Sequence, residues 1–280
     1  MKEMVSAELP EYNLRPLWDA ILDVYLQFET ICEKHQLRYC ADTGTTLGAI
    51  RHHGFIPWDD DLDVQMPRSD YTEFVKIVGS ELPNGYAWLD KSNCRTYEQS
   101  FGKVIVTDAK KVDSIARAVG MRLGQGIFID VFPVDGYPDS AMSRRWRKIE
   151  NYTLEVWAAI NKLARDVGLV KNAERNRIWV HRCISDFYDR RARRYSFGST
   201  KKCVSIGLSR RFDDKPYSYS RFGRPRKVSF DKCEMYVQED AEGYLRELFG
   251  DYLKLPPPDK RHPGHGAGEN MPWRLGPDQA

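Results

Sequence analysis

The chain has 280 residues, of which 41% are hydrophobic and 12% aromatic, which excludes a disordered protein and supplies core material for one large domain or two small ones. No window is apolar enough for a membrane span or a signal peptide, so we expect a cytoplasmic protein. The six cysteines lie far apart without a CxxC pair, which excludes a zinc ribbon and a compact disulfide framework.

The net charge of +3 conceals an uneven distribution. Residues 144 to 227 contain 23 Lys and Arg against 8 Asp and Glu, a balance of +15, which leaves −12 for the rest of the chain. The positive electrostatic potential of residues 144 to 227 attracts anions, such as nucleotide phosphates, a phosphorylated glycan carrier, an anionic membrane or nucleic acid. Solvated faces of long helices are the alternative interpretation.

The first predicted elements are a helix over residues 14 to 34, with apolar residues at three- and four-residue spacing, and a short strand over 37 to 41. A turn follows at Asp42-Thr43-Gly44-Thr45, where Gly44 permits a tight bend before the next helix. Backbone N–H groups and hydroxyls at such a turn suit a phosphate, although a Gly-Thr turn serves more often as a helix cap.

The acidic stretch RHHGFIPWDDDLDVQMPRSDY, residues 51 to 71, is the most informative part of the sequence. Its aspartates run into an apolar alternation that predicts a short buried strand, and in an extended chain Asp59, Asp61 and Asp63 point to the side opposite Asp60. Such a cluster either raises the pKa of its members or recruits a hard divalent cation. We therefore predict that Asp61 and Asp63 share a metal ion, with a solvated acidic turn as the alternative.

A second informative stretch is IFIDVFPVDG, residues 127 to 136, an apolar strand with Asp130 in its middle. Aspartate is uncommon in strands and costly to bury alone, so we interpret Asp130 as a third carboxylate for the same metal, with a buried pair to an arginine as the alternative. Asp135, between Pro133 and Gly136, is interpreted as a turn residue.

The remaining pattern predicts a helix from about residue 67, strands at 86 to 89 and 103 to 106, two basic helices between 140 and 197 that part near Gly168, and a strand at 203 to 208. A basic loop over 210 to 227 and a helix over 240 to 249, stopped by Gly250, follow. We predict an α+β (mixed α/β) fold, a mixed sheet flanked by helices. Its parts are a catalytic core at 1–139, a basic helical module with closing elements at 140–255, and a Pro/Gly-rich tail at 256–280.

Three segments, TGTTLGAIRHHGFIPWDDDLDVQMPRSDY, IDVFPVDG and YLRELFGDYLKLPPPDKRHPGH, together resemble the LicD family of phosphotransferases, which is related to fukutin-type ribitol-phosphate transferases. The resemblance implies a nucleotidyltransferase-like fold, in which a Gly-Thr or Gly-Ser turn faces a strand with paired aspartates. It also implies transfer of a phosphorylated alcohol, such as phosphocholine, from a CDP-activated donor to a sugar hydroxyl. The acceptor would be a cell-surface glycan or glycolipid, as in lipopolysaccharide or capsule biosynthesis.

Carried over by position, the resemblance implies that Mg²⁺ or Mn²⁺ is held by Asp61 and Asp63, with Asp59 beside them and Asp130 as the additional strand carboxylate. The phosphate-facing turn falls on Gly44 and Thr45. Members of the family commonly have two glycines before the threonine, whereas this chain has Thr43-Gly44.

Cations near these residues are candidates for phosphate contacts, and Arg51 is the best placed by sequence. The others are Lys103, Arg68 and His52. His52 and His53 have capping or packing as the alternative to proton transfer. Arg261, His262 and His265 either return over the site or belong to a disordered tail, and Trp58 is a candidate for stacking on a base or a choline ammonium, with burial in the core as the favoured alternative.

Two other functions compete with the phosphotransferase. Asp61-Leu62-Asp63 is also the DxD of metal-dependent glycosyltransferases, but those enzymes place it after an amino-terminal nucleotide-binding βαβ region, which this chain does not show. A basic RNA- or lipid-binding protein would leave the aspartates unexplained and lacks an RNP-type strand, so we expect no nucleic acid partner. We do expect the basic residues 144 to 227 to dock the chain peripherally on the anionic inner face of a membrane.

Overall fold

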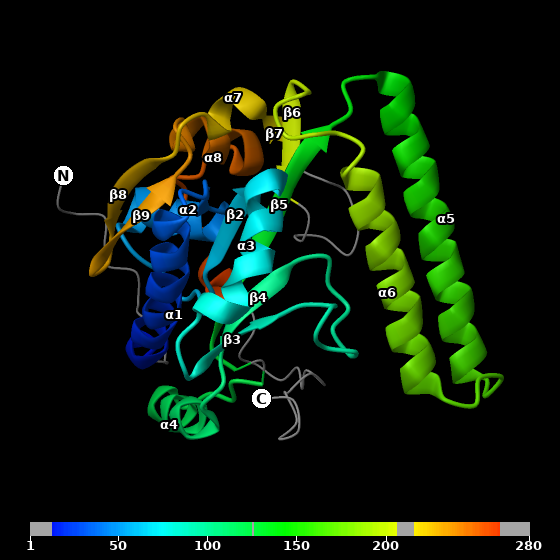
Figure 1. Cartoon of the computed structure of the whole chain (residues 1–280), viewed down its shortest axis with the longest axis horizontal. Helices are drawn as coiled ribbons and strands as arrows, with labels where there is room; N and C mark the ends of the chain where they lie inside the picture. The colour runs from blue at the N-terminus through cyan, green and yellow to red at the C-terminus, as the bar shows by residue number, and fades with distance from the viewer. Residues whose placement is uncertain (1–12, 125, 206–215, 264–280) are drawn as a thin grey trace.

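A mixed sheet forms the centre of the fold in the computed structural model, which describes residues 13–124, 126–205 and 216–263 (Figure 1). Its main strands, in spatial order, are β1 (Cys40–Ala41), β2 (Asp63–Pro67), β5 (Phe128–Tyr137), β4 (Gly102–Val106) and β3 (Tyr86–Leu89). Strands β6 (Lys202–Ser205) and β7 (Tyr217–Ser218) extend it from the far end of β5. Strands β2 and β5 are parallel and their neighbours antiparallel, so the predicted α+β class is confirmed.

Helices cover both faces of this sheet. The larger core lies under α1 (Arg15–Lys34), α3 (Arg68–Glu81) and α4 (Ala109–Val119), and the hairpin of β8 (Arg226–Phe230) and β9 (Cys233–Val237) closes it. The opposite face is covered by α2 (Thr43–His52), α7 (Tyr219–Phe222) and α8 (Ala241–Phe249). The long helices α5 (Ala141–Asp166) and α6 (Ala173–Ala192) form a separate hairpin, and a 3₁₀ turn, η1 (Pro258–Lys260), follows α8.

The alternation of strand side chains divides the residues of β2 and β5 between the two faces. Val64, Ile129 and Val131 point into the larger core beneath α1 and α3. Their neighbours Asp63 and Asp130 therefore point to the opposite face, since successive side chains of a strand alternate. Asp63 and Asp130 thus meet on one side of the sheet.

Asp135 is a buried strand residue and not the turn residue that the sequence suggested. It has 0% exposure in β5, and the Nε of Arg68 lies 3.0 Å from each of its carboxylate oxygens. The other arm of the guanidinium, Nη1, is 2.9 Å from Asp189 in α6. Arg68 consequently ties α3, β5 and α6 together, and this use of its charge takes it out of the set of candidate phosphate contacts.

Most other predicted elements are confirmed, with limited differences. The strand expected at 37 to 41 is reduced to Cys40–Ala41, because the chain from 36 to 39 has no strand partner. The loop expected over 210 to 227 contains β7, α7 and the start of β8 in its described part, and α4 has no counterpart among the predicted elements. Residues 206 to 208 of the expected strand lie outside the described residues.

The ion pair between Arg68 and Asp135 leads to a stability prediction. Arg68→Met removes the guanidinium and leaves a carboxylate that is 1% exposed, so the free energy of unfolding should fall by about 3–5 kcal/mol in urea titrations. Lys76→Met, on the exposed side of the same helix, removes a pair whose side chains are 64% and 51% exposed and should change it by less than about 1 kcal/mol. Equal effects of the two changes would contradict this account.

Candidate active site

The candidate site begins at the amino terminus of α2, which Asp42 caps. The Asp42 side chain is 0% exposed and accepts hydrogen bonds from the Thr43 N–H at 2.9 Å and from the hydroxyl of Tyr244 in α8. The Asp42 N–H in turn donates to the carbonyl of Asp63 at 2.9 Å, which joins the start of α2 to the start of β2. Burial raises the pKa of Asp42. The cap at Asp42 is the alternative that the sequence offered for this turn, and the contribution of Tyr244 has no signal in the sequence.

The bend that the sequence placed on Gly44 occurs at Thr43, where the helix begins. Thr43 has a φ of +31°, a conformation that a β-branched residue rarely adopts and that a glycine adopts without strain. This is the position at which the related family commonly has its first glycine. Gly44 serves another purpose: a Cβ there would lie 3.3 Å from Oδ2 of Asp59, so its absence lets the carboxylate approach the first turn of α2.

The acidic stretch is fixed by contacts on both sides. The indole N–H of Trp18 in α1 donates to the carbonyl of Asp59 at 2.8 Å, and the Asp63 N–H donates to the hydroxyl of Thr45 at 2.9 Å. Asp60 is buried and Asp59, Asp61 and Asp63 are partly exposed, which agrees with the predicted alternation, although strand β2 begins only at Asp63. Thr45 therefore holds the strand in place, and the three alternate carboxylates share one side.

These carboxylates interact strongly with one another. Loss of hydration raises the pKa of Asp59 well above its ordinary value of 3.8, and the charge of Asp61 and a hydrogen bond with Asp61 raise it further. The pKa of Asp63 is also raised well above 3.8, first by desolvation and then by the charges of Asp61, Asp130 and Asp42. The folded chain thus assembles five carboxylates at the junction of α2, β2 and β5.

Asp130 lies on the same side of the sheet as Asp63, and its ion-pair partner is Lys103. The strand register aligns Asp63, Asp130 and Lys103 across β2, β5 and β4, and residues aligned in this way have side chains on one face about 5 Å apart. The Lys103 Nζ lies 2.5 Å from Oδ1 of Asp130 and 3.5 Å from the ring centre of Phe128, and the two charged side chains are only 5% and 11% exposed. We call Asp63, Asp130 and Lys103 the charged row.

The structure does not bring Arg51 to the charged row. Arg51 lies in the last turn of α2, about 10 Å along the helix axis from Gly44. Its guanidinium donates to the carbonyl of Tyr252 at 2.7 Å and to Nε2 of His52 at 2.9 Å. Burial and the neighbouring charge of Arg51 lower the pKa of His52 to about 4, so this imidazole is neutral at pH 7. His53 is an exposed residue at the end of α2.

Arg261, in the carboxy-terminal segment, lies beside the acidic stretch, whereas Arg51 does not reach the charged row. The guanidinium of Arg261 lies 5.6 Å from the ring centre of Trp58, the residue before Asp59, and its Nε donates to the carbonyl of Pro256 at 2.8 Å. Trp58 is partly buried against the smaller core beside α8. The Nδ1 of His262 lies 3.3 Å from the carbonyl of Pro263, and His265 lies outside the described residues.

The donor atoms of the cluster are suited in type to a hard divalent ion, because all are carboxylate oxygens. Among residues 13–124, 126–205 and 216–263, no three His, Cys, Asp or Glu side chains are arranged around a common metal position. The carboxylates instead interact through a hydrogen bond between Asp59 and Asp61 and through the pair of Asp130 with Lys103. The residues fit Mg²⁺ or Mn²⁺ by chemistry, and binding would require side-chain rotation.

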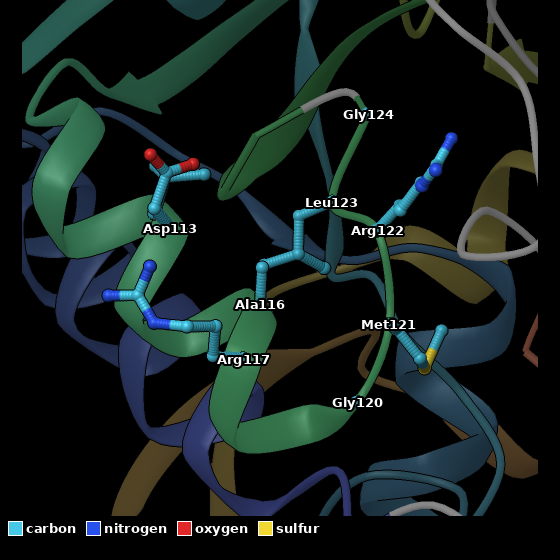
Figure 2. A pocket seen from close by; sticks show the side chains of 9 residues that line it. Asp113, Ala116, Arg117, Gly120, Met121, Arg122, Leu123 and Gly124 are labelled. Carbon is cyan, nitrogen blue, oxygen red and sulfur yellow. The ribbon is translucent and has the colours of Figure 1, made fainter.

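A surface pocket of about 470 Å³ lies elsewhere, between α4 and the segment that follows it (Figure 2). Figure 2 shows Leu123 reaching toward Ala116 across the pocket, with Asp113 and Arg117 on the helix. None of the site residues expected from the sequence lines it. This pocket is not the candidate active site.

Comparison with known proteins agrees with the geometry. Residues 36–153 match the family model described as LicD/FKTN/FKRP, nucleotidyltransferase domain, a span that contains α2, β2 and the whole charged row. The chain is thus similar to the LicD family, most specifically over this domain. It is 27% identical, over 92% of its own length and 97% of the relative's, to the lipopolysaccharide cholinephosphotransferase LicD of Haemophilus influenzae. Uncharacterised proteins of Rickettsia typhi and Rickettsia prowazekii are 42% and 40% identical over 53 residues, 19% of this chain and 17% and 20% of theirs.

One part of the candidate site lies outside the matched domain. Tyr244, whose hydroxyl binds the Asp42 cap, belongs to α8, and the Tyr252 carbonyl that holds Arg51 follows the same helix. The carboxy-terminal region therefore completes the support of α2, although the matched domain ends at residue 153.

The raised pKa of Asp63 leads to a prediction on stability and pH. A carboxyl whose pKa is higher in the folded state binds protons more tightly when folded, so it destabilises the fold as pH rises above its unfolded value near 4. In EDTA, Asp63→Asn should therefore raise the melting temperature relative to wild type, and the difference should grow from pH 4 to pH 8. Asp23→Asn, at a 55% exposed side chain of α1, is the control and should show no such trend. A difference that shrinks with pH would contradict the raised pKa.

Proposed function

We propose that this LicD-family enzyme transfers phosphocholine from a CDP-activated donor to a sugar hydroxyl of a lipopolysaccharide-type glycan. The observation that carries the proposal is the meeting of Asp59, Asp61, Asp63 and Asp130 at the amino terminus of α2, in a chain similar over 92% of its length to a lipopolysaccharide cholinephosphotransferase. Phosphoryl transfer needs charge neutralisation and positioning more than covalent chemistry from the protein. A cluster of carboxylates beside a helix amino terminus suits that requirement.

The residues of the site have separate roles in this proposal. Free backbone N–H groups in the first turn of α2, at Gly44 and Thr45, orient a phosphate of the donor, because unpaired N–H groups and the helix dipole favour an anion. Lys103 is the cation of the charged row and contacts a second phosphate oxygen. A divalent ion, Mg²⁺ or Mn²⁺, would be held by Asp59, Asp61, Asp63 and Asp130 and would supply neutralisation of the donor diphosphate.

We also place the enzyme at the inner face of a membrane, where a lipid-linked glycan acceptor is accessible. The +15 balance of residues 144 to 227 supports this placement, because anionic lipids attract basic segments. No helix within the described ranges is long and apolar enough to cross a bilayer. Association would therefore be peripheral for this part of the chain.

The first functional prediction concerns the metal. Purified enzyme given CDP-choline and a lipopolysaccharide acceptor should release CMP only with Mg²⁺ or Mn²⁺ present. Asp61→Asn should lower this rate by more than about 100-fold, because even changes in the outer shell of metal sites cost 10- to 100-fold. Asp23→Asn should retain wild-type activity. CMP release that persists in EDTA, or activity with UDP-sugars in place of CDP-choline, would refute the proposal.

The second functional prediction separates a structural role of Asp130 from a role in the reaction. Asp130→Asn removes the carboxylate paired with the buried Lys103 ammonium, so it should destabilise the fold by about 3–5 kcal/mol in urea titrations. Adding Lys103→Met removes the buried charge as well and should restore most of that stability.

CMP release should remain lost in the Asp130→Asn/Lys103→Met double variant, because neither the metal ligand nor the phosphate contact is regained. If the double variant recovered both stability and activity, Asp130 and Lys103 would be a structural ion pair only.

A further inference from the structure

The outward face of α5 carries an apolar stripe that no described element covers. Six of its side chains are 40–63% exposed, namely Met142, Trp146, Ile149, Val156, Ile160 and Leu163. Successive members are three or four residues apart, except for Ile149 and Val156, which are seven apart with the exposed Thr153 between them. The six side chains therefore lie on one side of the helix. The stripe runs along most of a 26-residue helix, a length of roughly 39 Å.

The opposite face of α5 makes several polar contacts where it meets α6. The Nη1 of Arg191 donates to the side chain of Asn151 at 2.8 Å and to that of Glu150 at 3.2 Å, and Arg165 donates to Asn176 at 3.0 Å. The buried residue that α5 contributes is Arg147, which is 6% exposed. Charged and amide side chains thus share the seam with one aromatic pair, Trp157 and Trp179, whose ring centres lie 5.8 Å apart, and the apolar side chains of the stripe face outward. A hairpin surrounded by water has the reverse distribution.

The position of α5 in the fold leaves this face open. In Figure 1, α6 lies between α5 and the body of the protein, and α5 stands at the outer edge. The element against which α5 packs is α6. Exposed apolar surface on this scale marks an interaction site in a folded protein.

The charge and residue types of this region favour a lipid bilayer over a second copy of the chain. Two copies paired through α5 would bring together two α5–α6 hairpins that each carry a net charge of +6, from 12 Lys and Arg against 6 Asp and Glu in residues 141–192, whereas an anionic leaflet complements that charge. Exposed basic residues, Arg145, Lys148 and Lys162, lie on the same helix as the stripe. Trp146 and Tyr152, which are 58% and 68% exposed, are of the residue types enriched at bilayer interfaces.

We infer that the outer face of α5 is the membrane-docking surface of this enzyme, and that the helix lies in the plane of an anionic bilayer with its apolar stripe among the lipid chains. Amphipathic helices bind in this way through buried apolar area combined with attraction to anionic headgroups. The inference rests on the proposed membrane placement and adds the surface and the insertion. It is independent of which group the enzyme transfers.

The experiment measures co-sedimentation with vesicles of phosphatidylethanolamine and phosphatidylglycerol. The Ile149→Gln/Ile160→Gln/Leu163→Gln variant replaces three exposed stripe residues, so the fold should be retained, as its melting temperature will show. The vesicle partition coefficient should fall by more than about 10-fold in this variant. The matched control, Leu26→Gln/Leu253→Gln, changes apolar residues that are 40% and 56% exposed on other surfaces and should bind as wild type does.

Insertion is measured separately through quenching of tryptophan fluorescence by brominated lipids, which should weaken in Trp146→Phe. Unchanged binding of the triple variant, with sensitivity to salt alone, would overturn the inference and leave the membrane placement intact. Absence of binding by wild type would overturn both. A dimer in sedimentation velocity that the triple variant abolishes, without vesicle binding, would identify a second copy as the occupant and refute docking to lipid.

CMP release with a soluble oligosaccharide acceptor distinguishes this inference from the proposed reaction. It should be equal in wild type and in the triple variant, because the stripe lies outside the charged row. If wild type bound vesicles through the stripe but released no CMP from CDP-choline, the proposed reaction would fail and the docking surface would stand.

Discussion

Repulsion among carboxylates is the constraint on which the site depends. Asp42, Asp59, Asp61, Asp63 and Asp130 meet where α2, β2 and β5 converge, and an uncompensated cluster of this kind would oppose folding. Different elements of the fold supply the groups that offset this repulsion. Tyr244 and the first N–H of α2 bind Asp42, and Lys103 pairs with Asp130. What remains is the raised pKa of Asp59 and Asp63, which a divalent cation would relieve.

The parallel pairing of β2 with β5 creates this meeting. Parallel strands require a crossover connection, and residues 68 to 127 provide one that includes α3, β3, β4 and α4. The register of the pair then places Asp63 beside Asp130, although they are far apart in the chain. A shift of one residue would turn Asp130 into the apolar core beneath α1 and α3, where its charge would be prohibitive. The register is therefore fixed by the apolar residues of β5 as much as by its aspartate.

Sequence reasoning succeeded where the signal is local and failed where it depends on which elements become neighbours. Periodicity predicted α1, α3 and β3, and like-charge density identified the acidic cluster. Asp135 was misassigned because Pro133 and Gly136 are local turn signals that pairing with β6 overrides. Arg51 is close to the aspartates in sequence, but α2 carries it to the other end of the helix. Neither Lys103 as the partner of Asp130 nor the cap contact of Tyr244 was visible before the strands and helices were placed.

The hairpin of α5 and α6 is attached to β5, the strand that carries Asp130 of the charged row. Arg68 joins Asp135 of β5 to Asp189 of α6, and its side chain is only 11% exposed, so solvent screens this link weakly. Nearer the middle of α6, Arg182 donates to the carbonyls of Lys91, Cys94, Arg95 and Tyr97. These bonds fix α6 against both β5 and the loop after β3. Since α5 packs on α6, a bilayer contacted by α5 would hold a defined orientation relative to Asp130, and the acceptor sugars would reach the charged row from one direction.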